Sequence, residues 1–297
     1  MAVGNPTPGG VYAQIRNEAP SFWAEFGADG SVIGALEEVA TPTRECFASA
    51  ARADATGSRT PFARGLVGWL GYEAGAWFET MPPRPPTPLP PAWWGRVKRW
   101  ARFDAQDRLV AHSPGLANGS FVEPALPRPT GRLAHLPEPA EFLGGVRTIQ
   151  QHLRAGDVYQ VNLARRLVVA RAGDPLHAWL RLRASNRARR GLLLETRHGS
   201  VVSNSPELFL RQRHRSVLTV PIKGTAPLSN PRADLLQSAK ERAELTMIVD
   251  LVRADLGRVS TAGTVRAETR RVGRVGHLWH AMQRVRTGGR PVAMTRR

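Results

Sequence analysis

Cysteine is almost absent from the sequence, which has a single one, Cys46, among 297 residues. One thiol excludes an internal disulfide framework and a zinc site built from cysteines. No apolar run approaches the roughly 18 consecutive residues that a membrane-spanning helix needs. The N-terminal stretch has no charged region followed by an apolar one, so it shows no secretory signal. We therefore expect a cytoplasmic protein that does not associate with membranes.

Lysine is the second scarcity. Of the 42 basic residues, three are lysine (positions 98, 223 and 240) and the remaining 39 are arginine. Lysine can lose its proton and attack an electrophile, whereas arginine effectively cannot. Lys223, kept in so arginine-rich a chain, is therefore a candidate nucleophile. The alternative is a lysine that only pairs with a phosphate or a carboxylate, a task that arginine could also perform.

Acidic residues are outnumbered, 24 against 42, which gives a formal net charge of +18. Such a charge can attract nucleic acid, acidic membranes or a small anion. The arginines are dispersed, however, with no long basic block and no interleaved aromatic residues of the kind that stack on bases. We therefore expect no nucleic-acid partner.

Alternating apolar residues and turn signals predict a fold of the α+β class, with largely antiparallel sheets and helices packed outside them. Strand–turn–strand patterns occupy residues 20–40, 93–110 and 192–204, and more strand follows to Val220. Proline-rich stretches at 81–92 and 124–139 are loops, because proline suits neither helices nor central strands. The second stretch predicts a boundary between a sheet-rich N-terminal part (1–135) and a partial catalytic part (136–297).

Helical spacing appears three times in the second part. The first helix ends before Gly156, the second begins at Asp174-Pro175, and the longest runs from Asn230-Pro231 to about Gly257. Between the first two, GDVYQVNLARRL alternates and predicts a strand with Tyr159, Val161 and Leu163 on one face.

The longest helix carries a predicted apolar stripe of Ala243, Met247, Ile248 and Leu251, with Glu244 in its middle. A carboxylate on a buried face is costly unless it is paired, hydrogen-bonded or bound to metal. A buried ion pair with an arginine from the sheet and a functional site are both compatible with this pattern.

Several motifs together resemble the chorismate-utilising enzyme family: LVGWLGYEAGAWFE, AGDVYQVNLARR, SNSPELFL, PIKGT, KERAELTMIVDLVRADLGRV and VGHL. The resemblance extends from about residue 20 to about residue 285. Within the family it is strongest to component I of aminodeoxychorismate synthase, in the para-aminobenzoate branch of folate synthesis. It implies chorismate as the substrate, Mg²⁺ as the cofactor and a glutamine amidotransferase partner that supplies ammonia.

The resemblance assigns three positions that separate the family's chemistries. Members that add water carry a lysine base where this chain has Gln160, so the isochorismate and salicylate branches are disfavoured. Anthranilate synthases usually have alanine at Lys223, whereas aminodeoxychorismate synthases have the lysine, which attacks C2 of chorismate before ammonia enters at C4. Glu207 matches the general acid for the departing hydroxyl, a role that requires burial or a neighbouring charge. Without the resemblance, a turn carboxylate would be the simpler interpretation of Glu207.

The remaining site residues also follow from the resemblance. Glu244 matches a Mg²⁺ ligand and Glu241 a second acidic position on the same turn, which suits an ion that takes one or two carboxylates. His277 matches a histidine near the substrate ring. Without the resemblance, a structural histidine would be the simpler interpretation. Gly224 and Thr225 match the turn that hydrogen-bonds the substrate.

Family members continue beyond the last matching motif with a segment that carries a substrate-gripping arginine and a further metal carboxylate. We therefore expect a C-terminally truncated chain that is weak or inactive alone, and a fold that is incomplete at that end. Two alternatives remain: an anthranilate synthase component I, or a non-catalytic remnant that binds the amidotransferase.

Overall fold

The computed structural model describes residues 6–18, 20–39, 65–82, 87–114, 116, 133–169, 173–213 and 215–288. Cys46 lies outside these residues, as do 83–86 of the first proline-rich stretch and 124–132 of the second. The chain divides into two units, one comprising Met1–Glu123 with Trp179–Arg297 and the other Pro124–Ala178. The second proline-rich stretch thus coincides with the start of the smaller unit. The chain returns to the first unit after Ala178, and the sequence pattern did not predict this second boundary.

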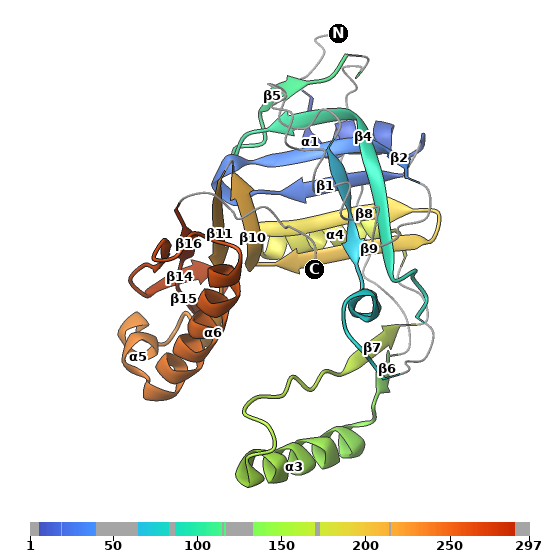
Figure 1. Ribbon diagram of the computed structural model, residues 1–297. Coiled ribbons are helices and arrows are strands. Elements are labelled where there is room, and N and C mark those ends of the chain that lie inside the picture. Colours follow the sequence, from blue (N-terminus) through green and yellow to red (C-terminus); the bar gives the residue numbers. More distant parts are fainter. Residues whose placement is uncertain are drawn as a thin grey trace. The chain divides into compact units, whose positions relative to one another are not determined.

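The first unit contains a large antiparallel sheet in the order β3-β4-β2-β1-β8-β9, with β5 added to β4 (Figure 1). The predicted strand pairs at 20–40, 93–110 and 192–204 are confirmed. Its strands are β1 (Ser21–Glu25), β2 (Ser31–Glu38), β3 (Leu66–Leu70), β4 (Ala92–Phe103), β5 (Leu109–His112), β8 (Arg190–Thr196) and β9 (Gly199–Ser205).

The two faces of β1 pack into separate apolar groups, as alternation requires. Phe22 is buried with residues of β2, β4 and β8. Trp23 lies on the opposite face, 5.8 Å from the ring of Tyr12 and 5.9 Å from that of Trp179. Tyr12 belongs to α1 (Pro8–Ile15), whose first turn is capped by the Thr7 hydroxyl. Short 3₁₀ turns, η1 (Gly27–Asp29) and η3 (Tyr72–Trp77), follow β1 and β3.

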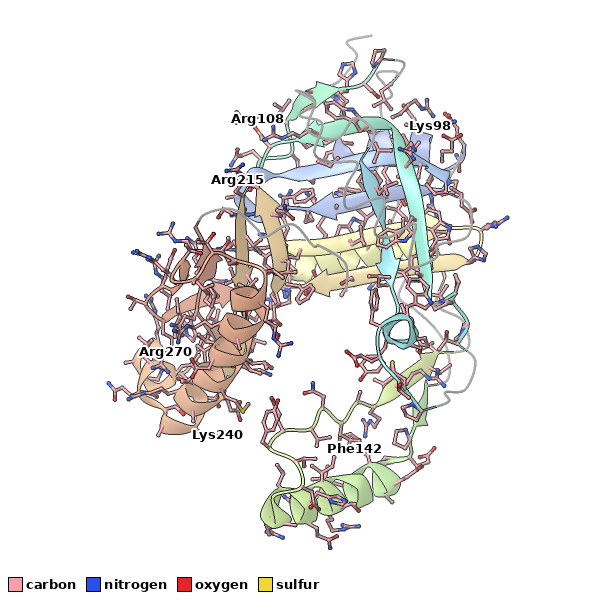
Figure 2. All side chains as sticks on the ribbon, viewed as in Figure 1. Lys98, Arg108, Phe142, Arg215, Lys240 and Arg270 are labelled. Carbon is pink, nitrogen blue, oxygen red and sulfur yellow. The ribbon has the colours of Figure 1, made fainter. Side chains whose placement is uncertain are left out.

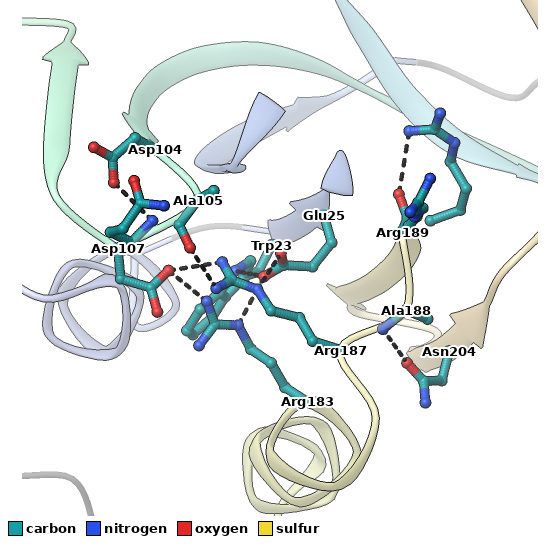
Figure 3. A network of polar contacts seen from close by, with 12 residues as sticks. Trp23, Glu25, Asp104, Ala105, Asp107, Arg183, Arg187, Ala188, Arg189 and Asn204 are labelled. Carbon is teal, nitrogen blue, oxygen red and sulfur yellow. Dashed lines mark hydrogen bonds and ion pairs between the residues drawn. The ribbon is translucent and has the colours of Figure 1, made fainter. Parts of the chain in front are cut away.

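A buried charge network fastens the end of α4 (Pro175–Ser185) to this sheet (Figure 3). The carboxylate of Glu25, 1% exposed, accepts hydrogen bonds from Arg183 Nε at 2.7 Å and Arg187 Nε at 2.9 Å. Both guanidinium groups also reach Asp107 Oδ1, at 2.5 and 2.7 Å. Two carboxylates thus balance two cations, which is the condition under which buried charge is tolerated.

The C-terminal part of the first unit builds two smaller antiparallel sheets, ordered β10-β11-β16-β13 and β12-β15-β14. Helices α5 and α6 pack on the second sheet and share an apolar core with it. The strands are β10 (Leu208–Arg213), β11 (Ser216–Val220), β12 (Ile222–Pro227), β13 (Val265–Ala267), β14 (Arg271–Val275), β15 (Leu278–Met282) and β16 (Val285–Thr287). The α+β class with antiparallel sheets and outer helices is confirmed.

The long helix predicted from Asn230-Pro231 is instead two helices, α5 (Arg232–Gln237) and α6 (Ala239–Arg258). Ser238 separates them because its extended backbone ends α5 and its hydroxyl caps α6 by accepting from Glu241 N at 3.3 Å. A serine at this position competes with helix continuation by satisfying the first backbone donors of the next helix.

The predicted stripe on this helix is also wrong. The buried side chains of α6 are Leu245, Val249 and Leu256, whereas Leu251 is 47% exposed. The helix carries two apolar faces, and the spacing rule cannot say which one meets the sheet. Packing against Ala281 and its neighbours on the sheet selects the Leu245 face.

The second unit holds α3 (Pro139–Ala155) and a strand pair, β6 (Leu133–Leu136) with β7 (Arg166–Val169). Helix α3 ends as predicted at Gly156, whose φ of 81° is the left-handed cap that glycine favours. The strand predicted over 157–167 is wrong up to Arg165, because among the described residues only 166–169 of this segment have a partner strand. Alternation reports which side chains share a face, but a strand also needs a neighbour for its backbone hydrogen bonds.

Candidate active site

The PIKGT motif forms β12, and Gly224 interrupts its pairing with β15. Lys223 pairs with Ala281 and Thr225 with His280, so Gly224 is an extra residue with φ of 80°. A bulge with glycine in the left-handed region inserts one residue into a strand without opening the sheet. The motif glycine is therefore explained by backbone geometry.

The bulge distributes the motif's polar side chains over two faces of the sheet. Directly opposed residues share a face, and Ala281 faces the core beneath α6, so Lys223 projects toward the α6 side. Thr225 and His280 project to the opposite face. Lys223 is half-buried, and the described residues include no acidic side chain within ion-pair distance of it.

Glu207 lies in the turn between β9 and β10 and reaches the start of the same motif. Its Oε1 accepts a hydrogen bond from the backbone N–H of Ile222 at 3.2 Å, one residue before Lys223. This contact brings the Glu207 carboxylate to the backbone of the motif, fifteen residues further along the chain. Glu207 is exposed, so the described residues do not supply the burial expected of a general acid.

Glu241 is directed at the bulge from the first turn of α6. A Cβ placed on Gly224 would lie 2.6 Å from Glu241 Oε2, which means that the carboxylate occupies the space left by the missing side chain. In a complete capping box this carboxylate would bond to the N–H of Ser238. That N–H instead donates to the backbone oxygen of Asp234 at 2.9 Å. Glu241 is therefore not used to cap its own helix.

Glu244 lies one turn further along α6, and its side chain is 41% exposed. The prediction that Glu244 lies on a buried face is therefore wrong, and of the two alternatives left open for it, the ion pair with an arginine of the sheet is not found among the described residues. Its ion-pair partner is Lys240 of the same helix, at 4.0 Å, and Lys240 is visible at the surface in Figure 2. An exposed pair of this kind contributes little stability, so Glu244 has no structural task that requires a carboxylate.

The acidic pair on α6 has the donor chemistry that Mg²⁺ prefers. Glu241 and Glu244 are three residues apart and therefore neighbours on one helix surface. Among the described residues, no group of three or more histidine, cysteine, aspartate or glutamate side chains is arranged to hold a metal ion. Mg²⁺ usually takes one or two carboxylates and keeps waters or substrate oxygens as its other ligands. Glu241, held in the space beside Gly224, and Glu244 therefore fit the ion as a partial site.

The two histidines near the motif have different surroundings. His277 lies in the exposed turn between β14 and β15. This turn is near the C-terminal end of β12, whereas Lys223 is near the start of that strand. His280, which sequence reasoning missed, has its Nδ1 3.1 Å from Thr225 Oγ1. Burial lowers the pKa of His280 below 6.5. The sequence feature that could have pointed to His280 is a second histidine three residues after His277, within a strand.

Gln160 belongs to the smaller unit, in the irregular segment that follows α3, and is half-buried there. A shallow cavity of about 420 Å³ lies in the first unit, at the C-terminal end of α6. None of the candidate residues lines it. Its lining consists of Asp250, Arg253, Ala254, Gly257, Gly263 and Val265.

Comparison with known proteins identifies similar chains. The family model described as chorismate binding enzyme matches residues 12–293. Aminodeoxychorismate synthase component 1 of Escherichia coli is 35% identical over 225 residues, which cover 69% of this chain and 49% of that protein. Anthranilate synthase component 1 of Streptomyces coelicolor is 34% identical over 269 residues, or 76% of this chain and 52% of that protein. The chain thus spans about half the length of the curated relatives it matches.

A solved structure supports the fold. Anthranilate synthase component I from Streptococcus pneumoniae superposes with a TM-score of 0.73 at 22% identity, covering 93% of this chain and 68% of that one. The described part of the chain contains no helix long and apolar enough to cross a membrane.

Proposed function

The chain belongs to the chorismate binding enzyme family, and on this premise we propose that it binds chorismate and exchanges the C4 hydroxyl for an amino group. This is the reaction of aminodeoxychorismate synthase component I, with ammonia supplied by a glutamine amidotransferase partner. Because the chain covers half of such relatives, its activity, substrate and partner are all part of the proposal.

One observation carries the proposal: Lys223 has no carboxylate partner among the residues that the structure describes, although Glu207 binds the backbone one residue before it. A lysine kept for charge pairing would have an acidic neighbour. An amine used as a nucleophile must instead lose its proton readily, which a paired carboxylate opposes. The exclusion of lysine from almost every other basic position supports the same assignment.

In the proposed mechanism, Lys223 Nζ forms a bond to C2 of chorismate as the ring double bonds shift and the C4–O bond breaks. Glu207 donates its proton to the departing hydroxyl, which leaves as water. Ammonia then forms a bond to C4, the double bonds shift back, and the C2–N bond to Lys223 breaks. The surplus ammonium proton returns to Glu207, and the site regains its starting state.

Glu241 and Glu244 would hold Mg²⁺ in this proposal. The ion, when bound, neutralises the ring carboxylate and stabilises charge as the hydroxyl leaves. The Glu241 carboxylate fills the space that Gly224 leaves by lacking a side chain, so it lies on the same side of the sheet as Lys223. Thr225 projects to the opposite face of the sheet, so the hydrogen bond expected from its hydroxyl to the substrate is not part of this mechanism.

The second candidate is anthranilate synthase, favoured by the similarity to the Streptomyces coelicolor protein. Product analysis separates the two reactions when the purified chain is given chorismate, Mg²⁺ and ammonium, and a lyase then converts any aminodeoxychorismate to para-aminobenzoate. Because the chain spans about half the length of such relatives, we expect little product, and that product to be para-aminobenzoate. It should be lost in Lys223→Ala but not in the control Lys98→Ala, whose lysine pairs with Glu37 on β2. Anthranilate as the product, unchanged in Lys223→Ala, would contradict the proposal.

A further inference from the structure

Residues 157–165, between α3 and β7, have the sequence of a strand but no partner strand among the described residues. The side chains of Tyr159, Val161 and Leu163, which alternate with polar ones, are 71%, 41% and 39% exposed. No backbone hydrogen bond joins residues 158–165 to another described residue. Free backbone groups beside exposed apolar side chains are the features that let a strand pair with another chain.

Helix α3 covers one face of this segment without burying it. A Cβ placed on Gly145 would lie 3.2 Å from Leu163 Cδ2, so the Leu163 side chain packs on the helix there. The guanidinium carbon of Arg165 lies 5.8 Å from the centroid of the Phe142 ring on the same helix. The structure describes α3 along its whole length, and none of its residues is buried. The helix and the face that carries Leu163 therefore form an apolar layer that a single copy leaves half covered.

The segment is complementary to itself in an antiparallel arrangement. Placing Val161 opposite Val161 of a second copy brings Tyr159 opposite Leu163, an aromatic side chain against an aliphatic one. The same placement brings Gln160 opposite Asn162, two amides that can hydrogen-bond to each other. Because directly opposed residues share a face, the apolar pairs lie on the α3 side and the amide pairs on the other.

This register also pairs the charges at the ends of the segment. Asp157 and Arg165 each lie four residues from Val161, so each carboxylate is opposite a guanidinium group of the other copy. A shift by one residue would exchange the two faces, and a shift by two would leave these charges unpaired. Within one copy, Asp157 Oδ2 is 2.8 Å from His152 Nδ1 in an exposed pair, which contributes little stability. A carboxylate can accept from both groups, so this contact does not oppose the new one.

We propose that residues 157–165 pair with the same residues of a second copy of the chain, as antiparallel strands centred on Val161. The occupant is a second copy because the apolar, amide and charge pairs all form in one register of the sequence with itself. A two-fold contact of this kind closes after two copies, so its product is a dimer. The α3 helices of the two copies then cover the apolar face of the shared strand pair. Chorismate chemistry plays no part in this contact, so its test is separate from that of the proposed function.

The first test is sedimentation velocity of the full chain over a range of protein concentrations. The net charge of +18 repels a second copy, so the measurement uses about 0.3 M salt to screen this repulsion. We expect a monomer–dimer equilibrium. Asp157→Arg places arginines opposite each other at both ends of the strand pair, and Arg165→Asp does the same with aspartates. Each substitution should therefore weaken dimerisation about tenfold or more.

Mixing the two variants distinguishes the strand pair from a general loss of structure. One variant then presents only arginine at the two positions and the other only aspartate, so we expect them to form a heterodimer. A mixture that stays monomeric, with both variants folded by circular dichroism, would overturn the proposal. An unsubstituted chain that is monomeric at every concentration would also overturn it, and would indicate that a different polypeptide covers the apolar surface.

The second test examines the register by disulfide formation in a chain whose single cysteine, Cys46, is replaced by serine. Val161→Cys places two thiols directly opposite each other, within the Cα separation that a disulfide spans. Tyr159→Cys is the control, since its two copies would lie roughly 13 Å apart along the strands. We expect a cross-linked dimer with Val161→Cys only. Equal cross-linking of the two variants, or none in Val161→Cys, would contradict the register.

Discussion

Replacing Gly224 with alanine tests the bulge in PIKGT and its contact with Glu241 together. Two costs are expected. The φ of 80° is strained for any residue with a Cβ, at about 1–2 kcal/mol. The added methyl group also lies 2.6 Å from Glu241 Oε2 and 3.2 Å from its Cβ and Cδ, so the carboxylate must leave its place. Moving this side chain off its rotamer costs about 1 kcal/mol more.

Gly263→Ala is the matched control. Its φ of 75° imposes the same backbone strain, but nothing lies within 4 Å of the position that a Cβ would occupy. By urea denaturation we expect Gly224→Ala to lose about 2–3 kcal/mol and Gly263→Ala about 1–2 kcal/mol. The decisive difference is in Mg²⁺-dependent chorismate binding, which should weaken about tenfold in the first variant and stay unchanged in the second. Equal effects of the two substitutions on binding would refute the assignment of Glu241 to the site.

Two further predictions concern the large sheet. Glu25→Gln removes a buried charge that two guanidinium groups share, and should lower the free energy of unfolding in urea by about 3 kcal/mol. Glu18→Gln, which breaks the exposed pair with Arg99, should cost less than about 1 kcal/mol, and equal losses would contradict a structural role for the network. Burial and the hydrogen bond to Glu195 raise the pKa of Tyr12 above its ordinary 10.0, so the folded state holds the phenol proton more tightly. Stability should therefore fall as pH rises above about 10, and less steeply in Tyr12→Phe; parallel pH profiles would refute this.

The sequence predicted most of the strands because their alternation coincides with turn residues at both ends. The pairs around η1 and around His198-Gly199 are examples. It failed where an element's partner decides the structure. Residues 157–165 alternate but have no neighbouring strand in the part of the chain that the structure describes. Helix α6 carries two apolar faces, of which only Leu245 and its neighbours meet the sheet.

The candidate site was predictable as a set of residues but not as a geometry. The rarity of lysine singled out Lys223, and motif resemblance added Glu207, Glu241 and Glu244. No pattern could indicate that Gly224 makes a bulge, or that this bulge turns Thr225 toward His280 and away from Lys223. Such information depends on strand register, which is set by contacts distant in sequence.

The central claim is that Lys223 attacks chorismate, and a covalent adduct tests it most directly. The full chain is incubated with chorismate and Mg²⁺ without ammonia, then acid-quenched, digested and analysed by mass spectrometry. A single turnover suffices, so the measurement does not need a fast enzyme. We predict that the peptide containing Lys223 gains the mass of chorismate less one water, and that Lys98 and Lys240 remain unmodified. A Lys223 that stays unmodified while chorismate is bound or consumed would contradict the account.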